Sequence, residues 1–250
     1  MLPFTSDELG ALLALWLLPF ARIAALFTSA PLLSHAAFPA RLRLAAALAI
    51  TGAVTLVQPA YALPQGSALI VALVEQVLLG LAIGFTMQLV FAAAQMAGEV
   101  IGLQMGIGFA SFFDPGGGGE SPLPAAFLSI CAFLVFLAID GHLVLIEAVA
   151  GHFRDGPPGK LLASLDPQTL ASAGGSVFRV ALQLAMAPIA GLLIVNIAFG
   201  LVARVSPQLN IFTVGFPAAL MAGLALLSLA APAWVGAMQQ AMQAALRALH

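Results

Sequence analysis

The chain has 250 residues, of which 62% are hydrophobic and 7% are charged, and its formal net charge is −2. Soluble domains are about 45–50% apolar and about 25% charged, so the charged side chains here are too few to cover a water-soluble globule. The composition excludes a cytosolic enzyme, a nucleic-acid binder and a disordered chain. It predicts an all-α integral membrane protein, because the strands of a membrane β-barrel alternate apolar and polar residues and these runs are apolar throughout.

About six long apolar segments are predicted to be helices of a membrane bundle. The second is short and the third and last are long, so one upright spanning geometry does not suit all six. Pro19, Pro188 and Pro232 fall inside segments and can kink their helices. The segments are residues 9–30, 42–57, 68–97, 122–150, 177–203 and 214–244.

Two connections between these segments are long. Residues 98–121 are glycine-rich and carry acidic but no basic side chains, and residues 151–176 form a polar, solvated excursion. In a six-span arrangement, three Lys or Arg residues in the loops fall on each side of the membrane. The positive-inside rule therefore gives no orientation.

Arg22, Asp140 and Glu147 are charged residues within apolar segments. Arg22 must face protein, a water-filled cavity or the interface, since a charge at the bilayer centre costs at least about 2.5 kcal/mol. Its candidate partners are Asp140, Glu147 and Glu75, and structural pairing is favoured over substrate binding. Asp140 and Glu147 are seven residues apart, on one helix face, where paired carboxylates can do acid/base work or sit near a helix end. The second reading is favoured.

The chain lacks the residue sets of an enzyme. There is no zinc-protease motif, no nucleophile elbow and no P-loop lysine. Cys131 is the only cysteine. We therefore expect no catalytic residue, no cofactor and no metal.

Small residues recur every four positions near the middle of the chain. On a helix this spacing forms a smooth strip that lets another backbone approach closely. Gly80 and Gly84 repeat the spacing in the third segment. The residues of the strip are Ala94, Gly98, Gly102 and Gly106.

An aromatic stretch and a glycine run follow the strip. Phenylalanines on a flexible segment suit a mobile apolar stopper, since hydrophobic constrictions close pores by excluding water. A surface loop whose aromatics dip into the membrane interface explains them equally well. The stretch contains Phe109, Phe112, Phe113, Asp114 and Pro115, followed by Gly116, Gly117, Gly118 and Gly119.

The connection between the last two segments has helix breakers at both ends. It is typical of the tip of a helical hairpin, although such breaks also build ion sites in secondary transporters. Its distinctive residues are Arg204, Pro207, Asn210, Phe212, Gly215 and Pro217.

Two of these stretches resemble the signatures of the FliR family, which comprises flagellar subunits and their injectisome counterparts. The first is Gly98-Glu-Val-Ile-Gly-Leu-Gln-Met-Gly106, followed by Phe109 and Asp114-Pro115. The second is Ser206-Pro-Gln-Leu-Asn-Ile-Phe212, followed by Gly215-Phe-Pro217. The resemblance covers nearly the whole chain, and the local forms at residues 112–115 and 210–212 are closer to the flagellar branch.

The resemblance implies a non-enzymatic export-gate subunit of the bacterial inner membrane, a multi-pass protein of the flagellar basal body. It implies a FliP-like half at residues 1–166, with a pore plug at residues 106–121, and a FliQ-like hairpin at residues 177–250. The implied partners are homologues of FliP, FliQ and FlhB, unfolded proteins in transit and membrane lipid, with no nucleic acid. Export energy would come from the ATPase and proton motive force of the wider apparatus.

A secondary transporter or channel with discontinuous helices is the main alternative. It would use Arg22, Asp140 and Glu147 for coupling and Asn210 as a ligand. Purification separates the two readings, because an export-gate subunit co-purifies with FliP and FliQ, whereas a transporter is self-contained and binds a solute.

Overall fold

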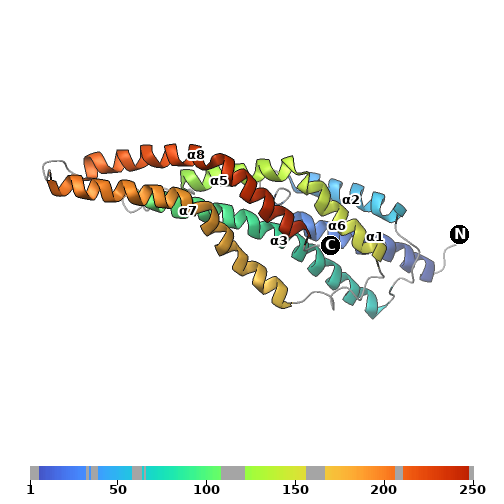
Figure 1. Cartoon of the computed structure of the whole chain (residues 1–250). Coiled ribbons are helices and arrows are strands. Elements are labelled where there is room, and N and C mark those ends of the chain that lie inside the picture. The colour runs from blue at the N-terminus through green and yellow to red at the C-terminus, as the bar shows by residue number, and fades with distance from the viewer. Residues whose placement is uncertain are drawn as a thin grey trace. The chain divides into compact units, whose positions relative to one another are not determined.

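The computed structural model describes residues 6–31, 34, 39–57, 64, 66–107, 122–155, 167–205 and 211–247. The regular structure of these residues is entirely helical, and the predicted all-α class is confirmed (Figure 1). The described part of the chain has seven helices. They are α1 (Ser6–Ser29), α2 (Ala40–Val57), α3 (Ser67–Gln104), α5 (Leu123–Ala138), α6 (Gly141–Asp155), α7 (Pro167–Val205) and α8 (Ile211–Arg247).

The predicted fourth segment, residues 122–150, consists of two helices, α5 and α6, which bend by 59° at the break between them. The chain breaks at Asp140, whose φ of 54° lies in the left-handed region. Asp is among the few side chains that adopt this conformation at low cost. The carbonyl of Asp140 accepts bonds from the N–H groups of Leu143 and Val144, at 2.9 and 3.1 Å. Asp140 therefore starts α6 rather than lying inside a continuous helix.

Both predicted connections are too long, because the helices on either side extend into them. α3 continues to Gln104, past the predicted end at residue 97, and Gly106 closes it with a φ of 82°. The N–H of Gly106 donates to Leu103 at 3.0 Å, and that of Ile107 donates to Gly102 at 3.1 Å. This is the Schellman pattern, for which glycine is preferred because it adopts positive φ freely. In the second connection, α6 runs to Asp155 and α7 already begins at Pro167.

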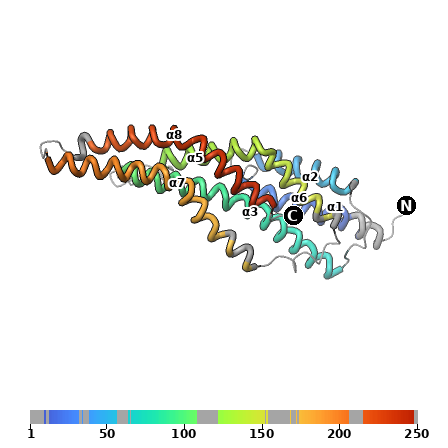
Figure 2. Tube along the Cα trace, in the orientation of Figure 1, coloured from blue at the N-terminus to red at the C-terminus, as the bar shows by residue number. Residues whose placement is uncertain are grey.

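The chain divides into two compact units, each built from separate stretches of sequence. Figure 2 shows the course of the described helices, coloured by residue number. Unit 1 comprises residues 1–89, 140–173 and 244–250, and contains α1, α2, the first part of α3 and α6. Unit 2 comprises residues 90–139 and 174–243, and contains the rest of α3, α5 and most of α7 and α8. The division at residues 166 and 177 that the family resemblance implies stays a prediction.

In unit 1, α1 packs against α2, α6 and α3. Ala14 and Leu18 of α1 form a buried cluster with Ala72 of α3. Further along both helices, Gly80 lies against the backbone of Arg22. One turn later, Gly84 lies against Ser29 and Ala30. The contacts advance in the same direction on both helices, so α1 and α3 are parallel.

In unit 2, α3 and α5 pack antiparallel. Gly98 meets Pro124 and Ala125, whereas Phe91, two turns earlier in α3, meets Phe136 later in α5. The two phenyl rings pack edge to face with their centroids 5.8 Å apart, a favoured aromatic geometry. The glycine strip therefore allows close approach between two helices of the same chain.

α7 and α8 form an antiparallel hairpin within unit 2. The indole Nε1–H of Trp234 donates to the carbonyl of Leu184 at 2.7 Å, and Gly191 lies against Leu226. The indole is buried, so this bond satisfies a donor that would otherwise be costly to remove from water.

Three helices are long and apolar enough to cross a membrane. They are Ser67–Gln104, Gly174–Val205 and Gly215–Arg247, and a fourth crossing arises if the bent pair α5 and α6 is one span. α1 contributes the shorter apolar stretch Leu13–Ser29. Length and composition thus give three or four candidate spans in the described residues.

Replacement by alanine should have opposite effects at Gly98, which is in tight contact with α5, and at Gly200, which contacts nothing. A Cβ at Gly98 would lie 2.6 Å from the carbonyl oxygen of Pro124, so Gly98→Ala should destabilise the protein by about 1–3 kcal/mol. Gly200 of α7 has nothing within 4 Å, and Gly200→Ala should stabilise its helix by about 0.5–1 kcal/mol. Thermal unfolding in detergent measures both, and an unchanged midpoint for Gly98→Ala would contradict the close contact.

Candidate functional site

Buried polar side chains gather in unit 1, in the helices α1, α2 and α3. Hydrophobic side chains make up nearly all of the core, so these polar positions stand out chemically. Burial of a polar or charged group requires partners. The buried polar residues are Arg22, Thr51, Glu75 and Gln76, with exposed fractions of 1%, 0%, 4% and 0%.

Arg22 faces protein rather than solvent. Its guanidinium carbon lies 4.0 Å from the centre of the Phe153 ring of α6. A cation over an aromatic face is stabilised by the ring quadrupole, by about 2 kcal/mol or more when desolvated. Of the three acidic partners proposed for Arg22, Glu75 is buried, whereas Asp140 and Glu147 are exposed.

Gln76 is a buried polar residue that the sequence reasoning missed. Neither its amide nitrogen nor its amide oxygen has a hydrogen-bond partner among the described residues. It stands one helical turn before Gly80 and one turn after Ala72, on the stripe of α3 that faces α1. The four-residue spacing to Gly80 and Gly84 is the signal that places Gln76 in a helix contact.

The end of the glycine strip meets the residues around the hairpin tip. A Cβ at Gly106 would lie 3.2 Å from the ring of Phe216, which stands between Gly215 and Pro217 in the first turns of α8. The neighbouring Met105 lies against Gly223, about two turns further along α8. The structure therefore brings together the two stretches that the sequence analysis singled out, at the point where the aromatic stretch begins.

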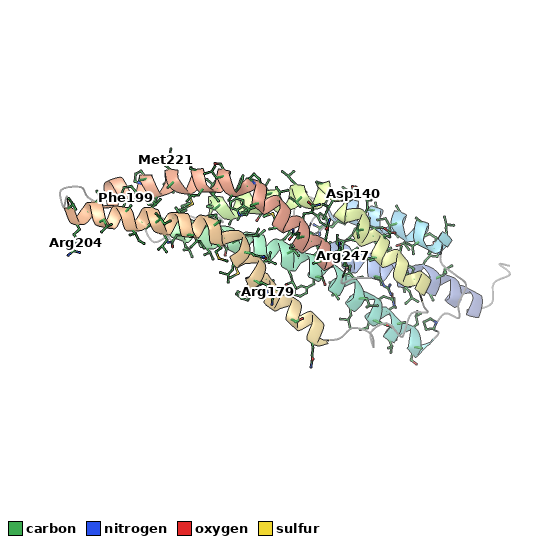
Figure 3. The ribbon with its side chains drawn as sticks, in the orientation of Figure 1. Asp140, Arg179, Phe199, Arg204, Met221 and Arg247 are labelled. Atoms are coloured by element: carbon green, nitrogen blue, oxygen red, sulfur yellow. The ribbon has the colours of Figure 1, made fainter. Side chains whose placement is uncertain are left out.

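The other predicted site residues fall in different places. Ala94 is buried, Gly102 lies against Pro122, and Arg204 is exposed in the last turn of α7, where a cation complements the helix dipole (Figure 3). The side chain of Phe212 is not described. The remaining predicted residues, which lie outside the described ones, are Phe109, Phe112, Phe113, Asp114, Pro115, Gly116, Gly117, Gly118, Gly119, Pro207 and Asn210.

A groove of about 360 Å³ lies between α5 and α8 in unit 2. Its one polar lining side chain, Ser228, donates its hydroxyl to the carbonyl of Ala225 at 2.7 Å. The groove is thus suited to apolar contact and offers no group for chemistry. It is lined by Leu123, Pro124, Ala126, Phe127, Ile130, Leu224, Leu227 and Ser228.

Long apolar helices, close backbone contacts at glycines and exposed apolar faces are the features of a helical membrane protein. Its sequence matches the family described as "Bacterial export proteins, family 1" over residues 13–245. The chain belongs to this family of bacterial export proteins, and the resemblance to the FliR family is confirmed.

Curated relatives share most of the chain. The flagellar biosynthetic protein FliR of Escherichia coli K12 is 41% identical over 234 residues, which cover 93% of this chain and 90% of that protein. The protein of the same name from Pectobacterium carotovorum is 42% identical over the same shares. That from Bacillus subtilis is 32% identical over 81% of this chain and 80% of its own length.

The buried amide of Gln76 predicts a stabilising substitution. Gln76→Leu removes two buried polar atoms without hydrogen-bond partners and keeps a similar volume, so unfolding should require about 1–3 kcal/mol more. Gln88→Leu, at an exposed position of the same helix, is the control and should leave stability unchanged. A lower unfolding midpoint for Gln76→Leu in detergent would show that the amide is hydrogen-bonded in the native protein.

Proposed function

We propose that this chain is a core subunit of the flagellar type III protein export gate, in the bacterial inner membrane and required for flagellum assembly. The matches to flagellar biosynthetic proteins over 93% of this chain support it, as does membership of the export family. In this proposal the chain helps to form and to plug a pore for unfolded proteins, as a multi-pass component of the basal body. It performs no catalysis, and export energy comes from other components.

The length of apolar surface along α3 is the observation that carries the multi-subunit part of this proposal. Ile70 and Leu103 are 66% and 67% exposed, near opposite ends of the helix. At 1.5 Å per residue they are about 50 Å apart along the helix, whereas the hydrocarbon core of a bilayer is about 30 Å thick. Covering both in lipid would need a tilt of about 53°, outside the usual range of about 0–40°.

We propose that protein covers at least one end of α3. Homologues of FliP and FliQ, with an associated FlhB, are the partners we propose for this surface. Such an assembly also accounts for the exposed apolar residues between the two ends, among them Val74, Leu78 and Phe85.

The aromatic stretch at residues 106–121 is the proposed plug. It begins where Gly106 ends α3 beside Phe216, so one end of the loop is attached to packed helices. Phe109, Phe112 and Phe113 supply the apolar closure, and residues 116–119 supply the flexibility of consecutive glycines. Bulky apolar side chains seal a pore because water is excluded from the constriction.

Replacing Phe109, Phe112 and Phe113 together by serine should make the assembled pore conduct small ions at rest, because polar side chains admit water. Deletion of residues 106–121 should have the same effect. Single-channel conductance of the reconstituted complex is the measurement, with Phe178→Ser, an exposed position of α7, as the control. Equal conductance of the triple variant and the parent would refute the plug.

The partner surface predicts a loss of assembly without a loss of fold. Ile70→Gln and Leu103→Gln change exposed positions, so the unfolding midpoint of the isolated chain should move little. At least one of them should reduce the yield of complex recovered with tagged FliP and FliQ. Full recovery of the complex with both variants would contradict the proposal that protein covers an end of α3. A chain that is purified without partner subunits and binds a solute would instead favour a transporter.

A further inference from the structure

Pro188 leaves one carbonyl of α7 without its usual helical donor. In an α-helix the N–H of each residue donates to the carbonyl four residues earlier, but proline has no N–H. Pro188 lies inside α7, so it cannot donate to the carbonyl of Leu184. Both residues are buried, and a buried carbonyl without a donor is costly. Another part of the protein is therefore expected to supply the hydrogen bond.

Trp234 of α8 supplies this donor. Its indole Nε1–H donates to the carbonyl of Leu184 at 2.7 Å, and the residue is 3% exposed. Indole has one N–H donor and no acceptor, so this single bond satisfies both partners. Prolines are tolerated in membrane helices where neighbouring groups bond the backbone atoms that they release. Here the neighbouring group is a side chain of the adjacent helix of the hairpin.

A third helix holds the indole in place. The ring of Phe127 in α5 packs edge to face against Trp234, with the ring centroids 6.3 Å apart and the planes at 63°, a favoured aromatic geometry. Trp234 thus contacts α5 through its ring and α7 through its N–H. The residues that make these contacts all belong to unit 2. We call Leu184, Pro188 and Trp234 the latch.

α7 changes direction near the latch. Figure 3 shows Arg179 on one side of a bend in α7, and Phe199 and Arg204 on the other. Pro188 lies between them in the sequence, and proline bends a helix because its ring clashes with the carbonyl four residues earlier. That carbonyl is the one to which Trp234 donates. A side chain of α8 therefore acts at the point where α7 bends.

A series of packing contacts connects the latch to the end of α3. Beyond the latch, Gly191 of α7 lies against Leu226 of α8, so the two helices stay packed past the bend. Three residues before Leu226, Gly223 lies against Met105 at the end of α3. The next residue, Gly106, closes α3 and starts the connection that contains the proposed plug. A change in the bend at the latch is therefore expected to shift the α8 residues that hold the end of α3.

We propose that the latch fixes the bend of α7 and thereby sets how the α7–α8 hairpin holds the end of α3. With the indole N–H on the carbonyl of Leu184, unit 2 keeps the geometry described above. Without that bond the carbonyl lacks a donor, and α7 takes other angles at Pro188. Trp234 is thus a positioning residue. The control of the bend follows from the contacts of unit 2, whereas its effect on pore closure rests on the proposed function.

Distances between two nitroxide labels test the latch in the full-length chain, purified from membranes with its bound subunits. The labels are attached to cysteines that replace the exposed Phe178 of α7 and Leu134 of α5, in a Cys131→Ala background. Phe178 is ten residues from Pro188, about 15 Å along the helix, so a 20° change of bend moves it by about 5 Å. Trp234→Phe keeps an aromatic ring but removes the donor. It should broaden the distance distribution and shift its mean by about 5 Å for such a change.

Two further variants are controls for the label distances. Trp16→Phe changes the other tryptophan, which is exposed in α1, and should leave the distance unchanged. Pro188→Ala gives residue 188 an N–H for the carbonyl of Leu184, so Trp234→Phe should have no effect in that background. An unchanged distance in Trp234→Phe, or an equal shift in the Pro188→Ala background, would overturn the latch.

Resting conductance of the reconstituted complex tests the effect of the latch on the pore. Trp234→Phe should raise it above that of the parent, because the end of α3 is no longer held in one position. If the triple serine variant of the proposed plug conducts and Trp234→Phe does not, the link between latch and plug is wrong. If neither conducts, the plug is refuted and the link with it, and the label distances still decide whether the latch sets the bend.

Discussion

Close approach of other helices to α3 is the constraint on which both units depend. Gly80 and Gly84 admit the backbone of α1 in unit 1, and Gly98 and Gly102 admit the start of α5 in unit 2. Lipid tails are as apolar as leucine, so little hydrophobic force drives helices together inside a bilayer. Their attraction comes from dispersion, which falls steeply with distance. Glycine makes that distance short.

The burial of Arg22 follows from the same contact. Gly80 has no side chain, so the backbone of α1 lies directly on α3 at Arg22. A residue on that part of α1 is enclosed by its neighbours, and the guanidinium finds the face of Phe153. The cation is thus held by the packing of three helices. Removal of the Arg22 charge and disturbance of the Gly80 contact would therefore both affect the packing of α1, α3 and α6.

The sequence predicted what depends on composition and spacing, and missed what depends on local backbone conformation. The all-α class and the glycine strip followed from apolar runs and four-residue intervals. The break at Asp140 did not, because the Asp140-Gly141 pair, a turn signal, lies inside a long apolar run that favoured a continuous segment. Glycines after residue 97 suggested a loop, although packing against α5 keeps them helical. Gln76 carries no charge, so attention to charged residues within apolar segments passed over it.

Side-chain size separates two kinds of apolar surface that hydropathy treats alike. Small residues on α3 permit close contact with other helices of the same chain, as at Gly80, Gly84 and Gly98. Large apolar side chains, among them Ile70 and Leu103, lie on the exposed side of the same helix. A chain with 62% hydrophobic residues can therefore use one apolar face for its own packing and present another to its surroundings. Residue volume, rather than hydrophobicity itself, distinguishes the two faces.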